Sequence, residues 1–187
     1  MVPGMWHDLM TSMSVAGQVC LGVVFCLAAI HKLRYWTILP GVISNYRLLP
    51  RALVAPAAAI LPPLEMIVGI VLLSGLEKLW AALAAIILLG VFAVAMGINL
   101  HRGRIHIDCG CGQLFLKQTL SWILVARNVV LALLLLPCLA ITGAVPAAVL
   151  VTGACAGLAF AMLYVLVNTI SALPKTGAMP GRPHSSA

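Results

Sequence analysis

The chain has 187 residues, of which 63% are hydrophobic and 8% charged, and its formal net charge is +7. A soluble domain carries about 25% charged residues, so long apolar runs with so little charge predict membrane-spanning helices and exclude an ordinary soluble enzyme. Because the basic residues lie between these runs, the net charge indicates loops at a membrane surface and not a nucleic-acid-binding patch. Phosphate-binding and dinucleotide-binding glycine motifs are absent from the sequence.

Five apolar runs of about 20 residues follow one another, each long enough to cross roughly 30 Å of hydrocarbon. Residues 1–11 form a short polar lead, and residues 171–187, rich in Pro, Gly and Ser, have a composition typical of disorder. The sequence therefore predicts an all-α, polytopic membrane bundle in which residues 12–170 form one transmembrane domain. Its spans are expected at residues 12–32, 52–74, 79–99, 119–142 and 147–168.

The distribution of basic residues predicts how the chain is oriented. Lys78 falls on one side, whereas nine basic residues fall on the other, and by the positive-inside rule that side is cytoplasmic. The basic, aromatic segment Leu33–Arg51 then lies at the cytoplasmic headgroup level. In the last span, Gly153 and Gly157 form a GxxxG pattern that favours close packing of helices. The nine basic residues are Lys32, Arg34, Arg47, Arg51, Arg102, Arg104, Lys117, Lys175 and Arg182.

The longest polar run, residues 101–113, holds two cysteines on either side of a single glycine. Cys109 and Cys111 are within disulfide range if the backbone between them turns, and glycine permits this. The resulting ring would be small and strained, and strained disulfides are readily reduced. Arg102 and Arg104 favour the reactive thiolate, while Asp108 opposes them. This pattern indicates thiol–disulfide exchange, although a plain turn between two helices is the alternative.

The cysteines could also serve in a metal site or as apolar side chains of the spans. His101, His106, Cys109 and Cys111 could together bind zinc or copper, but their spacing matches no strong zinc motif and the nearby arginines disfavour a cation. We therefore expect no metal and no cofactor. The lone cysteines of the spans are interpreted as small apolar fillers, or else as a second thiol set that passes electrons onward. They are Cys20, Cys138 and Cys155.

Two ionisable residues lie within apolar spans. Glu65 is near the middle of the second span and Arg127 is inside the fourth. Counting from the cytoplasmic ends leaves a difference in depth of roughly 8 Å, most of which an arginine side chain can bridge. We therefore expect a Glu65–Arg127 pair, which either fixes how two helices register or provides a polar site for a small ligand or a proton.

Several sequence blocks stand out together by their order and spacing. They are His31–Arg34, Asn45–Pro50, Glu65, Asn99–Arg104, Ile107–Gly112 and Arg127–Asn128. These blocks resemble the MauE family of methylamine-utilisation proteins, within the wider DoxX-like group of small helical membrane proteins, and the resemblance covers about residues 12–142. It implies a bacterial inner-membrane protein that serves the processing, transport or maturation of the methylamine dehydrogenase beta subunit. It also implies a MauD-like periplasmic protein of thioredoxin fold as partner.

Charge pattern and resemblance conflict over the side of the membrane on which the cysteines act. The implied substrate is periplasmic, whereas the charge rule places Cys109 and Cys111 in the cytoplasm. Either the pair relays cytosolic electrons, or the loop dips into the membrane, or the charge rule fails here. Two rival functions stay open: a small-molecule transporter or binder that uses Glu65 and Arg127, and a structural membrane scaffold.

Overall fold

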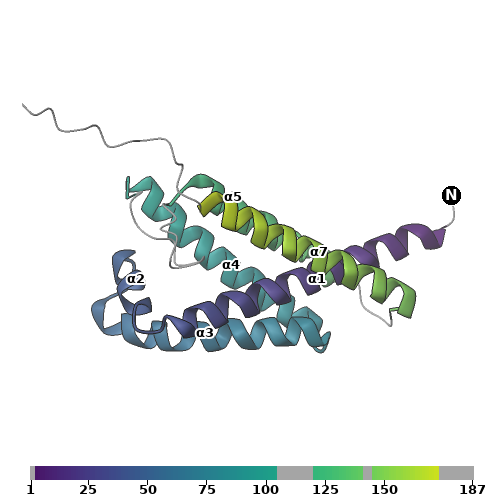
Figure 1. Cartoon of the computed structure of the whole chain (residues 1–187), viewed down its shortest axis with the longest axis horizontal. Coiled ribbons are helices and arrows are strands. Elements are labelled where there is room, and N and C mark those ends of the chain that lie inside the picture. The colour runs from purple at the N-terminus through teal and green to yellow at the C-terminus, as the bar shows by residue number, and fades with distance from the viewer. Residues whose placement is uncertain (1–2, 105–119, 141–144, 173–187) are drawn as a thin grey trace, which may run out of the picture.

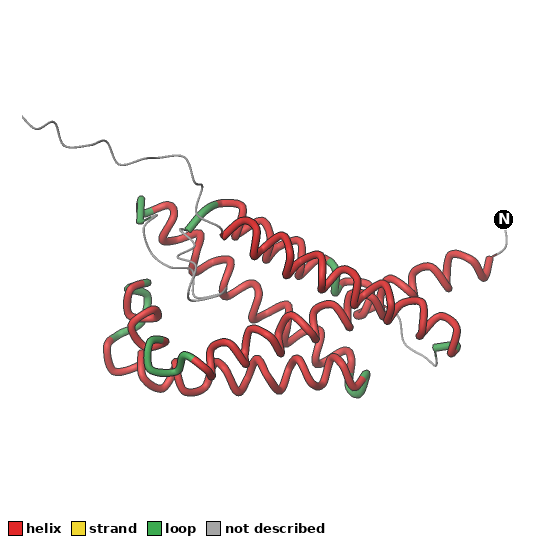
Figure 2. Tube along the Cα trace, in the orientation of Figure 1, coloured by secondary structure: helices red, strands yellow, loops and turns green. Residues whose placement is uncertain are grey.

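The computed structural model describes residues 3–104, 120–140 and 145–172, and within these ranges all regular structure is helical (Figure 2). Five of its helical segments are long and apolar enough to cross a membrane, which confirms the expected all-α, polytopic fold. The helices are α1 (Pro3–Arg34), α2 (Leu39–Asn45), α3 (Arg51–Ser74), α4 (Lys78–His101), α5 (Trp122–Leu133), α6 (Leu136–Ala140) and α7 (Ala147–Ala172).

Helix α1 is the central helix of the bundle, because it packs along both α3 and α7. With 32 residues it is about 48 Å long, so its N-terminal part projects beyond the other helices (Figure 1). It begins at Pro3 and thus includes most of the polar lead.

Small residues allow α1 and α7 to approach closely, as the GxxxG pattern predicted. A Cβ atom added to Gly157 would lie 2.6 Å from the carbonyl oxygen of Ala16, and one on Gly153 would lie 2.7 Å from the Cβ of Val15. Neither position can carry a side chain unless the two backbones move apart. The pattern therefore packs two helices of the same chain.

The fourth span is not one continuous helix. Helix α5 ends at Leu133 and the short α6 begins at Leu136. Pro137 accounts for the break, because proline lacks the N–H that would bond the carbonyl one turn earlier, and its ring crowds that turn. At the break, Leu134 lies directly against Gly17 of α1, where a larger residue would collide with the Leu134 carbonyl.

Most of the molecular surface around the spans is apolar. Ile123 is 79% exposed and Met162 75% exposed, whereas Leu21, Leu72 and Leu135 are fully buried between the helices. Large apolar side chains pointing outward on this scale are typical of helices surrounded by lipid.

The end of α1, the start of α3, the end of α4, the start of α5 and the end of α7 lie together at one end of the bundle (Figure 1). We call this the basic end, since Arg34, Arg51 and Arg102 lie there. A hydrogen bond from Nη1 of Arg104 to the carbonyl oxygen of Asn45, 3.3 Å long, ties the chain after α4 to α2.

Candidate functional site

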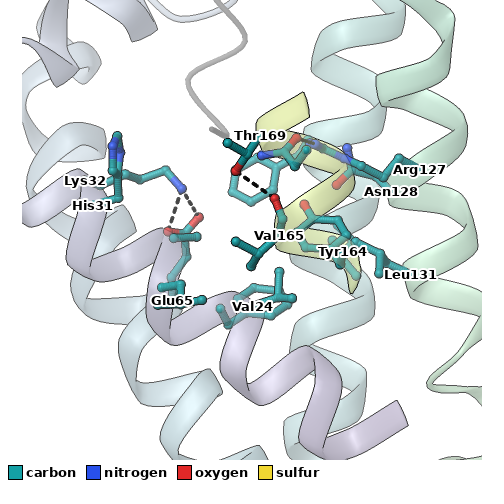
Figure 3. Close-up of a pocket in the computed structure, with 16 residues that line it drawn as sticks. Val24, His31, Lys32, Glu65, Arg127, Asn128, Leu131, Tyr164, Val165 and Thr169 are labelled. Carbon is teal, nitrogen blue, oxygen red and sulfur yellow. Dashed lines mark hydrogen bonds and ion pairs between the residues drawn. The ribbon is translucent and has the colours of Figure 1, made fainter. Parts of the chain in front are cut away.

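A cavity of about 220 Å³ opens between α1, α3, α4, α5 and α7, toward the basic end (Figure 3). Every one of the five spans contributes to its wall. Apolar side chains make up most of the lining, and a smaller set of polar groups faces the same space. The polar residues are His31, Lys32, Glu65, Arg127, Asn128, Tyr164, Asn168 and Thr169.

An ion pair between Lys32 and Glu65 forms one wall of this cavity. The Lys32 Nζ atom lies 2.8 Å from Oε1 and 2.7 Å from Oε2 of Glu65. Both side chains are at most 5% exposed. The ammonium group also lies 5.5 Å from the ring centre of Phe92, which adds a cation–π contact. The carboxylate is therefore neutralised by a residue two positions from the end of α1.

The expected Glu65–Arg127 pair does not form. Arg127 instead donates a hydrogen bond of 2.7 Å from Nη1 to the Oδ1 atom of Asn168, and its guanidinium lies 5.5 Å from the ring centre of Tyr164. Arg127 and Glu65 still line the same cavity, on opposite walls (Figure 3). The pairing changes because Lys32 extends its chain inward from α1, the helix against which α3 packs, whereas Arg127 projects towards α7.

Lys32, one of the basic residues counted on the cytoplasmic side, lies in the last turn of α1 at the basic end but is not at the surface. It is 4% exposed and lies inside the bundle, so it contributes nothing to the charge of the surface. The other described basic residues of that count, Arg34, Arg47, Arg51, Arg102 and Arg104, are at the basic end and are at least partly accessible.

The sequence-predicted redox residues lie at or beyond the edge of the described chain. Arg102 is exposed, and Arg104 bonds to Asn45. Asp108, Cys109 and Cys111 fall outside the described residues. The chain leaves α4 and re-enters α5 at the basic end, and α5 carries Arg127 into the cavity within two turns of its start.

The cysteines of the spans are present as free thiols. Cys20 and Cys138 are buried, and Cys155 is exposed on α7. The Oγ atom of Ser14 lies 3.3 Å from the sulfur of Cys138, a contact that helps to hold α1 against α6. Within the described ranges no three His, Cys, Asp or Glu side chains cluster as metal ligands. His106, Cys109 and Cys111 lie outside those ranges.

Three residues of the site were missed from the sequence: Lys32 as the partner of Glu65, and Asn168 and Tyr164 as the partners of Arg127. One signal was available for Asn168. An amide inside an apolar span must find a polar partner, and an arginine in a neighbouring span is the strongest candidate.

Fold and site together define a multi-pass helical membrane protein in which a buried ion pair and an arginine line one cavity. The sequence profile described as methylamine utilisation protein MauE matches residues 10–144. The chain belongs to this family of methylamine utilisation proteins.

Individual relatives agree with the family assignment. The chain is 40% identical over 159 residues to the methylamine utilization protein MauE of Paracoccus denitrificans, covering 83% of this chain and 86% of that protein. It is 38% identical over 169 residues to its counterpart in Paracoccus versutus, covering 87% and 91%. A third MauE protein, from Methylorubrum extorquens, is 42% identical over 106 residues, 57% of each chain. No solved structure matches this chain.

Proposed function

We propose that this chain is an accessory protein of the bacterial inner membrane that serves the processing, transport or maturation of the methylamine dehydrogenase beta subunit. The observation that carries the proposal is the family match over residues 10–144, together with relatives named as methylamine utilization proteins. Five apolar helices support the membrane location. The family resemblance implies a periplasmic, disulfide-rich substrate.

The proposed chemistry is thiol–disulfide exchange at Cys109 and Cys111. Reducing their disulfide takes up two electrons and two protons, and oxidising the dithiol gives back the same number. A MauD-like protein of thioredoxin fold is the proposed exchange partner, so each turnover passes one disulfide from one protein to the other. Arg102 and Arg104 precede Cys109 by seven and five positions in the sequence and favour the attacking thiolate.

Trapping the thiols tests this proposal. Native membranes are treated with an alkylating reagent that adds mass to reduced cysteines, and the full chain is compared with the Cys109→Ser and Cys111→Ser variants. We expect a mixture of reduced and oxidised pairs that shifts when the thioredoxin-like partner is deleted. A pair that stays fully reduced, with or without that partner, would contradict exchange.

A second candidate function is that of a small-molecule binder. The observation that favours it is the cavity of about 220 Å³, which brings Glu65 and Arg127 to one space even though they do not pair. Polar groups gathered around a cavity between transmembrane helices are typical of binding sites.

A further inference from the structure

The charges around the cavity do not balance. In the described part of the chain Glu65 is the carboxylate of the cavity wall, and both of its oxygens bind Lys32. Arg127 forms no salt bridge there. Its Nε atom is buried and has no hydrogen-bond partner among the described residues. Among the described residues, the guanidinium of Arg127 thus contacts the amide oxygen of Asn168 and the ring of Tyr164 but no carboxylate.

We propose that this cavity binds the phosphate group of an anionic phospholipid, with Arg127 as its ligand. A guanidinium presents five N–H donors in a planar fork and binds phosphate through paired, charge-assisted hydrogen bonds. The hydrogen bond from Nη1 of Arg127 to Asn168 fixes the plane of the guanidinium. The Nε atom of Arg127 has no acceptor among the described residues. A bound phosphate would neutralise a charge that is costly inside a membrane protein.

The cavity walls favour a lipid over a soluble anion. Leu27 and Val165 line the cavity and are 46% and 36% exposed, so the cavity is open where α1 and α7 line it. The cavity therefore meets the surface that faces lipid, between α1 and α7. Val24, Phe25 and Leu131 add apolar wall beside the polar groups, as an amphiphile with a charged head and an apolar tail requires.

Depth in the membrane agrees with a phosphate group. Asn168 lies four residues before the end of α7, and Arg127 lies five residues after the start of α5. At 1.5 Å per residue both are about 6–8 Å from the helix ends at the basic end, near the level of the headgroups. Basic pockets between transmembrane helices on the cytoplasmic side are known to bind the headgroups of anionic lipids. The volume of about 220 Å³ far exceeds the roughly 10–15 Å³ that one water molecule needs.

This inference rests on the second candidate function, and its test measures binding alone, so it does not depend on the chemistry of the cysteines. The full-length protein is purified in detergent, and lipid binding is measured by native mass spectrometry. The probes are phosphatidylglycerol, phosphatidylcholine and soluble glycerol phosphate. We expect phosphatidylglycerol to bind at least about tenfold more tightly than either of the other two, because only it combines a net negative charge with an apolar tail.

Variants locate the site. Arg127→Gln is expected to weaken phosphatidylglycerol binding by about tenfold or more, and Arg127→Lys by less, because lysine keeps the charge but loses the fork. Arg51→Gln is the matched control: Arg51 is an exposed basic residue at the same end that does not line the cavity, so its removal should change affinity less than twofold.

Three results would overturn the proposal. Equal affinity for phosphatidylglycerol and phosphatidylcholine would show that the net charge of the lipid does not determine binding. Equal affinity for glycerol phosphate and phosphatidylglycerol makes the site one for a soluble anion. Unchanged lipid binding in a folded Arg127→Gln protein places the site elsewhere. If that variant does not fold, the comparison of lipids on the wild-type protein and the Arg127→Lys variant still decide the question.

Discussion

Lys32 and Glu65, 33 positions apart in the chain, share a two-contact ion pair of 2.8 and 2.7 Å inside the helix bundle. The pair ties the last turn of α1 to the middle of α3. Taking both charges out of water is costly, and only their close contact compensates for it. Removing one partner leaves the other charge buried and unpaired, so the two residues stabilise the bundle only together.

A double-mutant cycle tests this dependence. Glu65→Gln and Lys32→Met should each lower the free energy of unfolding by about 3–5 kcal/mol, the usual cost of leaving one member of a buried pair alone. The double variant should cost clearly less than the sum of the two. Unfolding followed by circular dichroism in detergent gives the three values. Arg51→Gln, an exposed charge at the same end, should change stability by less than about 0.5 kcal/mol.

A second cycle, with Glu65→Gln and Arg127→Gln, distinguishes the two possible partners of Glu65. A coupling between Glu65 and Lys32 that is larger than the coupling between Glu65 and Arg127 agrees with the observed contacts. Additive losses for Glu65→Gln and Lys32→Met would contradict them.

Packing of α1 against α7 predicts a second outcome. Gly157→Val should destabilise the protein by about 1–3 kcal/mol, because its Cβ would meet the Ala16 carbonyl at 2.6 Å and the backbones must separate. Gly90→Ala is the control: a Cβ there meets nothing within 4 Å, and alanine is favoured over glycine in a helix by about 1 kcal/mol. Equal stability losses in the two variants would argue against a close approach at Gly157.

Much of the fold is predictable from the pattern of apolar residues along the sequence. A helix that crosses hydrocarbon must bond its backbone internally and be apolar along its whole length, so each span is visible as an uninterrupted run. What the runs do not show is the break before Pro137 or the true start of α1 at Pro3. The start of α1 is hidden because apolar residues such as Trp6 and Leu9 stand among polar ones. Pro137 alone does not predict a break, because Pro56, Pro62 and Pro63 lie inside the continuous helix α3.

The site was harder to predict, since it depends on which helices are neighbours. Glu65 and Arg127 were recognisable as costly charges, and both do reach one cavity. Their partners were not recognisable. Lys32 stands at the end of a span, where sequence patterns favour a surface role, and its flexible four-carbon stem decides where the charge lies. Asn168 meets Arg127 across 41 positions of sequence, through a side-chain hydrogen bond between α5 and α7.

Topology gives a further prediction. The basic end is expected in the cytoplasm, because Arg34, Arg51 and Arg102 lie there even after buried Lys32 is left out of the count. Reporter fusions after Arg51 and after Gly112 should therefore both report a cytoplasmic location. A periplasmic signal at either position would reverse the orientation and place Cys109 and Cys111 beside the proposed substrate.

The proposed function is tested most directly in cells in which this membrane protein carries both Cys109→Ser and Cys111→Ser. The measurement is the disulfide state of the methylamine dehydrogenase beta subunit in those cells. We predict that correctly bonded beta subunit no longer accumulates, while the membrane protein itself is still made. The Cys155→Ser variant, which changes an exposed free thiol of α7, should support normal accumulation. Normal amounts of fully bonded beta subunit in the double-serine strain would contradict thiol–disulfide exchange by this protein.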